Sequence, residues 1–345
     1  MTTGRGHNHA VAGHAGGPRG RAGSGRLGAA VVVAAPYLWL VTFFLVPFLI
    51  VLKISLSETA IALPPYVPVL DLGHGLAGVG DFLASLSSAN YVNLGTDALY
   101  VVSYLKSLKV ATLSTAMLLA LGLPLAYAMA RAPRRLQPVF VLLVVLPFFT
   151  SFLIRVYAWI NILQHDGLLN RGLVALGVID RPVIFLATDL AVYIGLVYSY
   201  LPFMVLPLYA SLARLDDSLL EAAADLGCPR WKAFLVVTLP LAARGIGAGV
   251  LLCFVPIVGE FVVPDLLGGS DTAMIGQTLW TEFFANKDWP AAAAVAVVLL
   301  VVLMVPIALY QHLQTRDLTA GSLPGGGATG NVAAADRAAP VGAER

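Results

Sequence analysis

The chain has 345 residues, of which 59% are apolar and only 12% carry a charge. This balance excludes an ordinary soluble domain and indicates a protein that resides in a lipid bilayer. The formal net charge of +2 gives no strong electrostatic footprint for nucleic acid. Of the two cysteines, Cys228 lies in a polar stretch and Cys253 in an apolar run, so neither a disulfide nor a metal site is expected.

The N-terminal segment, residues 1–26, is rich in Gly, Ala, Arg and His, and we expect a disordered tail because it has too few apolar residues for a core. Residues 27–52 carry no charge and exceed the roughly 20 residues that a helix needs to cross a bilayer. This first predicted span is too long for a signal-peptide core, so we expect it to be retained. Residues 53–105 are rich in Gly and Pro and are predicted to form an external segment.

Further apolar runs predict four more spans. Residues 109–130 form the second, with a kink expected at Pro124. The third begins near Gln137 and must extend past Arg155, because the uncharged part before that arginine is barely long enough to cross. The fourth and sixth spans are residues 190–213 and 291–310, and residues 317–345 are expected to be a second disordered tail.

The fifth span is predicted to carry an acidic residue into the membrane. The uncharged stretch between Arg244 and Glu260 has about 15 residues, too few to cross a core of about 30 Å at 1.5 Å per residue. An ionisable group inside a span is expensive and usually faces a cavity or a partner, so Glu260 is the leading candidate for the substrate pathway. Two alternatives are an ion pair with Arg155 and a position at the outer interface.

Other side chains near the external ends of the spans are weaker pathway candidates. Asp265 could attract a cation at the external mouth, although acidic loop residues are commonly just solvated. Aromatic side chains can hold a cation over the ring face, but at span ends they more often serve as interfacial anchors. The aromatic candidates are Tyr157, Trp159, Tyr198 and Trp280.

Six spans place both tails on one side of the membrane. That side also receives the basic residues of segments 131–135 and 214–244, and it is richer in Lys and Arg than the other. The positive-inside rule therefore predicts that both termini and the loop between the fourth and fifth spans are cytosolic.

This loop, residues 214–240, has the pattern of two short helices. Ser218 and Glu221 have the spacing of a capping box, S-x-x-E, at a helix start. Gly227 tolerates the left-handed conformation that ends a helix, and Pro229 suits the start of a second one. The second helix is expected to run directly into the fifth span.

The loop also resembles a family signature. The sequence Glu221-Ala222-Ala223, followed at fixed spacing by Gly227 and by Leu239-Pro240, is similar to the EAA loop of bacterial ABC importer permeases. In that family the loop forms a coupling helix that docks on an ATP-binding subunit. The resemblance implies an ATPase-coupling role for Glu221, Ala222, Ala223, Asp225, Gly227 and Pro240.

Motifs elsewhere look like the spermidine/putrescine permeases of this family. They include segments 36–40, 146–159 and 201–207, and the segments 259–264, 266–269 and 283–290 look most like the putrescine branch. The resemblance covers residues 35–316. It implies an all-α membrane protein with six spans and the type I ABC importer permease fold, with residues 27–316 as its permease domain.

The resemblance further implies partners. They are two copies of an ATP-binding subunit, a second homologous permease and a periplasmic substrate-binding protein. The chain has no G-x-x-x-x-G-K-[ST] motif, so ATP and Mg²⁺ are expected on the ATPase, with no cofactor bound by this chain and no enzymatic activity of its own. The alternative function is a stand-alone ion-coupled carrier or channel for a small cation, in which Glu260 would be the ion-linked group.

Overall fold

The computed structural model describes residues 24–68 and 85–320. The two predicted tails therefore lie almost entirely outside the described residues, as does the middle of the 53–105 segment. The chain divides into two compact units, residues 1–53 and 54–345. The first unit is one helical run, α1 (Ser24–Leu40), the π-helical turn η1 (Val41–Leu45) and α2 (Val46–Ser55). Its apolar stretch Val32–Ser55 is long enough to cross a membrane, as predicted for the first span.

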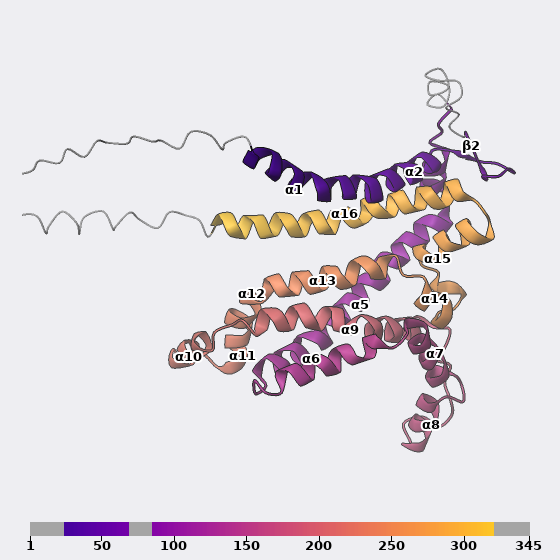
Figure 1. The fold of residues 1–345 in the computed structure, drawn as a ribbon. Coiled ribbons are helices and arrows are strands. Elements are labelled where there is room, and N and C mark those ends of the chain that lie inside the picture. The colour runs from indigo at the N-terminus through magenta and orange to yellow at the C-terminus, as the bar shows by residue number, and fades with distance from the viewer. Residues whose placement is uncertain (1–23, 69–84, 321–345) are drawn as a thin grey trace, which may run out of the picture. The chain divides into compact units, whose positions relative to one another are not determined.

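Among its described residues, the regular structure of the second unit is helical apart from a small hairpin, in which β1 (Glu58–Thr59) pairs antiparallel with β2 (Tyr66–Val67) (Figure 1). Its longer helices are α5 (Ala98–Arg131), α9 (Asp189–Leu212), α13 (Ala243–Val258) and α16 (Trp289–Ala320). The shorter ones are α4 (Ala89–Thr96), α6 (Gln137–Val145), η3 (Leu146–Phe149), α7 (Phe152–Leu163), α8 (Leu168–Ala175), α10 (Ser218–Asp225), α11 (Arg230–Ala233), η4 (Phe234–Thr238), α12 (Leu239–Leu241), α14 (Val262–Leu267), η5 (Ser270–Thr272), α15 (Ile275–Trp280) and η6 (Thr281–Ala285).

The core of this unit is the packing of α5, α9 and α13 against one another. Where α13 crosses α9, a Cβ on Gly245 would meet the Ser211 side chain and lie 2.9 Å from the Pro207 carbonyl oxygen. Inside a bilayer no hydrophobic effect drives helices together, so close backbone approach at small residues supplies the packing. Fully buried apolar side chains fill the space between the three helices, among them Leu118, Leu196, Met204, Leu208 and Ile257.

Two of the predicted spans are bent. The third consists of the helical pieces Gln137–Phe149 and Phe152–Ala175, which meet at 87°, because Thr150 and Ser151 between them are extended. The second bent pair is Arg230–Leu241 and Ala243–Val258, at 68°. The structure therefore has four candidate spans, or six if each bent pair counts as one.

The second bend corrects the prediction that the loop's second helix runs straight into the fifth span. The helical path breaks at Ala242, whose ψ of −3° departs from the helical value. Pro240, two residues earlier, has no N–H to donate back along the helix, which weakens the backbone hydrogen bonding at this point. Helix α5 departs from the prediction because it is longer and unbroken. It begins at Ala98 rather than near Lys109, with the Asp97 carboxylate accepting from the Leu99 N–H, and it passes through Pro124 without ending.

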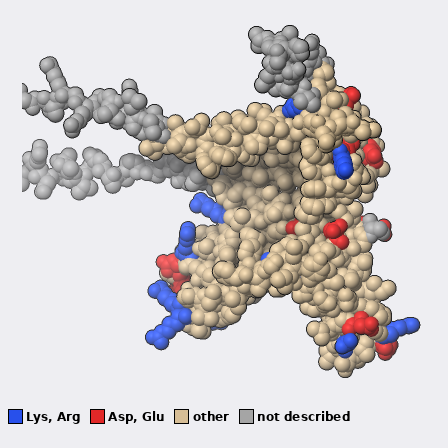
Figure 2. Space-filling model, turned by 45° about the vertical axis from the view of Figure 1, so that its right-hand side comes forward, with Lys and Arg blue, Asp and Glu red and all other residues tan. Residues whose placement is uncertain are grey.

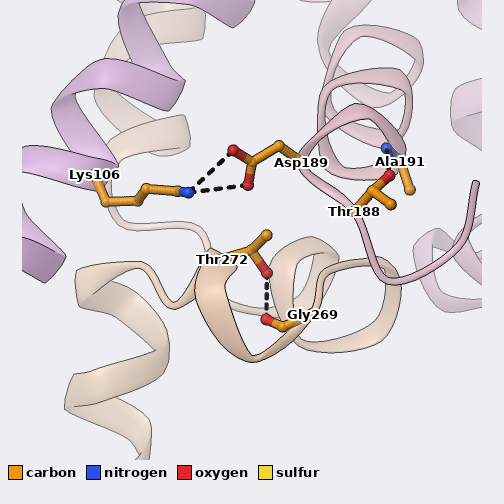
Figure 3. A network of polar contacts seen from close by, with 6 residues as sticks. All are labelled: Lys106, Thr188, Asp189, Ala191, Gly269 and Thr272. Atoms are coloured by element: carbon orange, nitrogen blue, oxygen red, sulfur yellow. Dashed lines mark hydrogen bonds and ion pairs between the residues drawn. The ribbon is translucent and has the colours of Figure 1, made fainter.

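Charges gather at the two ends of the second unit. Figure 2 shows basic side chains around the α10–α11 end and a broad, largely uncharged surface next to it. At the opposite end, an ion pair joins α5 to the start of α9, with the Lys106 ammonium 3.0 Å from the Asp189 carboxylate (Figure 3). The Thr188 hydroxyl caps the same helix end by accepting from the Ala191 N–H. The polar ends and the apolar middle match a helix bundle that spans a bilayer.

Replacing Gly245 with alanine should destabilise the bundle, because the added methyl group overlaps Ser211 and the α9 backbone. Overpacking of this kind typically costs about 1–3 kcal/mol. Thermal unfolding of the purified protein in detergent, followed by loss of the monodisperse peak, should show a lower midpoint. Gly172→Ala in α8 is the control, since its Cβ would meet nothing within 4 Å. Equal midpoints for the two variants would contradict the packing account.

Candidate functional site

A cavity of about 820 Å³, here called the Glu260 cavity, lies between α7, α9 and α13 in the second unit. Its walls are mainly apolar, and three of its polar side chains carry a charge or a phenol: Arg155 from α7, Tyr200 from α9 and Glu260 from the residues between α13 and α14. The hydroxyls of Thr150 and Ser199 also line it. Such a volume is in the usual range for small-molecule sites. The full lining is Phe148, Thr150, Phe152, Arg155, Ser199, Tyr200, Phe203, Leu251, Leu252, Val255, Pro256, Glu260 and Ile307.

The Glu260 carboxylate is held by two neutral donors. The Tyr200 hydroxyl donates to one carboxylate oxygen at 2.6 Å, and the backbone N–H of Val262 donates to the other at 3.0 Å. Glu260 lies just after the end of α13, where the chain turns into α14. The two hydrogen bonds fix the orientation of the carboxylate in the cavity.

Arg155 brings a cation into the same cavity. Its residue is only 8% exposed, and its guanidinium lies over the rings of Phe148 and Phe152, at 5.3 and 5.7 Å from their centres. The buried Nε atom has no hydrogen-bond partner among the described residues. The ion pair with Glu260 considered from the sequence is not formed, since Glu260 bonds to Tyr200 and Val262 instead.

The other pathway candidates do not converge on Glu260. Trp159 and Tyr198 pack edge to face, 5.5 Å between ring centres, and Tyr198 lines a separate cavity of about 330 Å³. Tyr157 is 53% exposed on α7 and lines neither cavity. Asp265 accepts a hydrogen bond from Gln277, while Trp280 stacks on Phe261, the residue after Glu260.

Sequence reasoning missed Tyr200 as the partner of Glu260. The sequence does place the Tyr200 hydroxyl inside an apolar span. A buried Tyr hydroxyl usually finds a hydrogen-bond partner, so this position could have predicted one. Sixty residues separate it from Glu260, so no local pattern joins the two. The rings of Phe148 and Phe152 over Arg155 were also missed, although both stand close to it in the chain.

The 214–240 loop forms the two predicted helices, but its first helix starts differently. Ser218 is the first helical residue and Asp217 is the N-cap, so the predicted capping box is not formed. The residue before the N-cap, Asp216, explains this different start. The Asp216 carboxylate accepts from the Ser218 N–H at 3.0 Å, and this hydrogen bond holds the pKa of Asp216 below its usual value.

The end of the first helix follows the prediction. Gly227 has a φ of +75°, which favours glycine. The N–H of Gly227 donates to the Ala224 carbonyl and that of Cys228 to the Ala223 carbonyl, the pair of bonds that defines a Schellman motif. Pro229 is the residue before α11, with an extended ψ of 149°. Glu221, Ala222, Asp225, Gly227 and Pro240 are exposed and Ala223 is half-buried.

Two contacts fasten the loop to the end of α5. Arg131, the last residue of α5, forms an ion pair with Asp217 at the start of α10. Its guanidinium also lies 5.5 Å from the centre of the Tyr127 ring, and that ring packs edge to face on Phe234 of η4 at 5.1 Å. The loop is therefore attached to α5 as well as to α9.

Comparison with known proteins identifies the family. Residues 118–316 match the family model described as "Binding-protein-dependent transport system inner membrane component". The chain belongs to this family. It is an inner-membrane permease, a transport subunit of an ABC importer rather than an enzyme.

Curated relatives narrow the family further. The spermidine/putrescine transport system permease protein PotB of Haemophilus influenzae is 37% identical over 280 residues, which cover 81% of this permease and 92% of the relative. The protein of the same name from Escherichia coli K12 is 42% identical over 221 residues, or 64% and 80% of the two chains. The permease thus belongs with the spermidine/putrescine type of the family.

A solved structure confirms the fold. A bacterial ABC transporter involved in the import of the acidic polysaccharide alginate superposes with a TM-score of 0.65 at 17% identity, over 85% of this permease and 98% of that chain. At this identity the likeness concerns the fold alone. The predicted all-helical ABC importer permease fold is confirmed.

Breaking the Arg131–Asp217 ion pair should loosen the loop of this permease. Arg131→Gln or Asp217→Asn should speed amide hydrogen exchange in α10 by up to about fivefold, since an ion pair open to solvent contributes at most about 1 kcal/mol. Mass spectrometry of the detergent-solubilised protein measures the exchange. The doubly reversed variant Arg131→Asp/Asp217→Arg should return towards the wild-type rate, and exposed Arg134→Gln should leave the rate unchanged. A double reversal that exchanges as fast as either single variant would contradict the role of the pair.

Proposed function

We propose that this permease carries a putrescine-type polyamine across the membrane, driven by a separate ATPase. The observation that carries the proposal is the combination of an oriented carboxylate in the Glu260 cavity with an exposed helix–turn–helix at the charged end. The named relatives are polyamine permeases, which supports the same substrate class.

The orientation follows from charge. The end that carries α10 and α11 also carries exposed basic side chains, which the positive-inside rule assigns to the cytosol. Both termini then lie in the cytosol if the two bent pairs each cross once. The basic side chains at this end are Arg131, Arg134, Arg135, Arg214, Arg230, Lys232 and Arg244.

The loop is the proposed docking site for the ATPase. Its apolar side chains Leu226 and Trp231 are 89% and 68% exposed, although they stand among charged residues. Exposed apolar side chains ringed by polar ones are typical of a protein interface. The complex we infer holds two ATPase copies, which bind ATP and Mg²⁺, a second homologous permease and a periplasmic binding protein.

The Glu260 cavity is the proposed site on the substrate path. A diamine offers two ammonium groups and a short apolar chain, and the cavity offers one carboxylate among mainly apolar and aromatic walls. Arg155 weakens the attraction for a cation, because it places a positive charge in the same space. A transport site benefits from moderate affinity, since the substrate must leave as well as bind.

We infer putrescine rather than a longer polyamine as the substrate from three sequence segments. Residues 259–264, 266–269 and 283–290 resemble the putrescine branch. The first of these contains Glu260 itself, and the third lies next to it in space through the stacking of Phe261 on Trp280.

Uptake by reconstituted vesicles tests the proposal. The complete complex should take up labelled putrescine only when ATP and the binding protein are present, and unlabelled spermidine should compete while a phosphonate should not. Glu260→Gln should lower the rate more than tenfold and Tyr200→Phe by a smaller factor, because the phenol only orients the carboxylate. Asp180→Asn, on an exposed loop, is the charge-loss control.

Two results would contradict the proposal. Putrescine uptake by the permease alone, without ATPase or ATP, would support the stand-alone carrier. Wild-type uptake by Glu260→Gln would remove Glu260 from the path.

A further inference from the structure

Six aromatic rings form a continuous ladder in the second unit. In spatial order they are Phe261, Trp280, Phe284, Phe283, Trp289 and Tyr66. Successive ring centres lie 4.8, 4.1, 4.9, 5.2 and 6.4 Å apart. Four of the five spacings lie within the range of about 4.5–7 Å for favourable aromatic contacts, and the Trp280–Phe284 spacing is slightly shorter. We call this set the aromatic ladder.

The aromatic ladder extends from the chain neighbour of Glu260 to a second cavity. At one end Phe261 directly follows Glu260, whose carboxylate enters the Glu260 cavity. At the other end Phe283, Phe284 and Trp289 line a second cavity of about 620 Å³, which we call the hairpin cavity because residues 59–65 form its other wall. The ladder therefore extends from the hairpin to the residue that follows Glu260.

Two rings in the middle of the ladder, Trp280 and Phe284, are exposed, although their segment is hydrogen-bonded to α5. Trp280 is 46% exposed and Phe284 55%, so parts of both rings remain accessible. Behind them, the buried Glu282 carboxylate accepts from the Tyr100 hydroxyl at 3.0 Å and from the Asn286 amide at 2.9 Å. The bond from Tyr100 attaches η6 to α5, so the segment that carries the exposed rings is fixed to the helix core.

The charges beside the aromatic ladder favour a cation. Glu260, Glu282 and Asp288 lie beside ring positions in the chain, and in the described part of the protein each accepts hydrogen bonds from neutral groups only. Two cations offset part of this charge, since Lys287 lines the hairpin cavity and Arg155 lines the Glu260 cavity. The resulting negative potential adds to the electron-rich ring faces, which attract ammonium groups within about 6 Å.

We propose that the aromatic ladder is a track on which an alkyl diammonium ion passes between the hairpin cavity and Glu260. The inference rests on the proposed function and deepens it. An alkyl diammonium ion fits this surface because its methylene groups pack on the rings while its charged ends meet ring faces and carboxylates. A row of weak sites lets the ion move from ring to ring, whereas one strong site would hold it.

The test uses the complete complex in vesicles with saturating putrescine-loaded binding protein. Trp280→Leu and Phe284→Leu keep apolar bulk and remove the ring, so each should lower the putrescine uptake rate by about fivefold to thirtyfold. Trp280→Phe should retain most of the rate. Phe149→Leu is the control for losing an exposed ring, because Phe149 is 78% exposed and outside the ladder.

A second measurement separates the cation–π interaction from packing. Tryptophan carrying one, two or three ring fluorines at position 280 keeps the size of the ring and weakens its negative face stepwise. The logarithm of the uptake rate per complex should fall with each fluorine.

Each outcome decides the inference. If the wild-type complex takes up putrescine and the fluorinated variants or Trp280→Leu transport at the wild-type rate per complex, the track is wrong. If Trp280→Leu lowers only the amount of inserted protein, the ring is a lipid anchor and the track is again wrong. A wild-type complex that takes up no polyamine would instead overturn the proposed function, and the track with it.

Discussion

The packing of α9 against α13 is the contact on which the rest of the second unit depends. Gly245 brings the two backbones together, since any larger side chain would meet Ser211 and the Pro207 carbonyl oxygen. Gly249 repeats this one turn later, where a Cβ would lie 2.9 Å from the Met204 sulfur. Because both helices also pack on α5, these approaches fix the three-helix core.

The cavity and the loop are both built on this core. Helix α9 carries Tyr200, which orients Glu260, and its C-terminal end leads directly into the 214–240 loop. Helix α5 is fastened to the same loop through Arg131 and to the opposite end of α9 through Lys106. A displacement of the loop therefore acts on α5 and α9 together, and through α9 on the wall that holds Glu260. The bend at Ala242 makes α13 a less direct connection than a straight fifth span would be.

Several features that depend on neighbouring residues in the chain were predicted correctly from the sequence. Apolar run length located the candidate spans, and Gly227 ended its helix in the left-handed conformation that only glycine adopts easily. Local patterns failed where two of them compete. The capping box at Ser218 is not formed, because the helix begins at Ser218 and the Asp216 carboxylate accepts from the Ser218 N–H.

Bends and contacts between distant residues were beyond local patterns. Pro124 is accommodated inside α5, whereas the break at Ala242 follows Pro240, so a proline in an apolar run does not by itself predict where a span bends. The Tyr200–Glu260 hydrogen bond and the aromatic ladder each join residues from separate elements. The hydrogen bond depends on the packing of α9 and α13, which the sequence shows only as scattered glycines, and the ladder on how β2, α15, η6 and the start of α16 pack together.

We propose that the 214–240 loop transmits ATP hydrolysis to the core, and a matched pair of glycines tests this role most directly. Gly227 and Gly177 both follow a helix end with positive φ, at +75° and +69°, and a Cβ at either would meet nothing within 4 Å. Valine at either site carries the same local backbone penalty. In the reconstituted complex, Gly227→Val should lower putrescine uptake at least tenfold while ATP hydrolysis continues, and Gly177→Val should leave uptake within about twofold of wild type. Wild-type uptake per ATP hydrolysed by Gly227→Val would contradict the account.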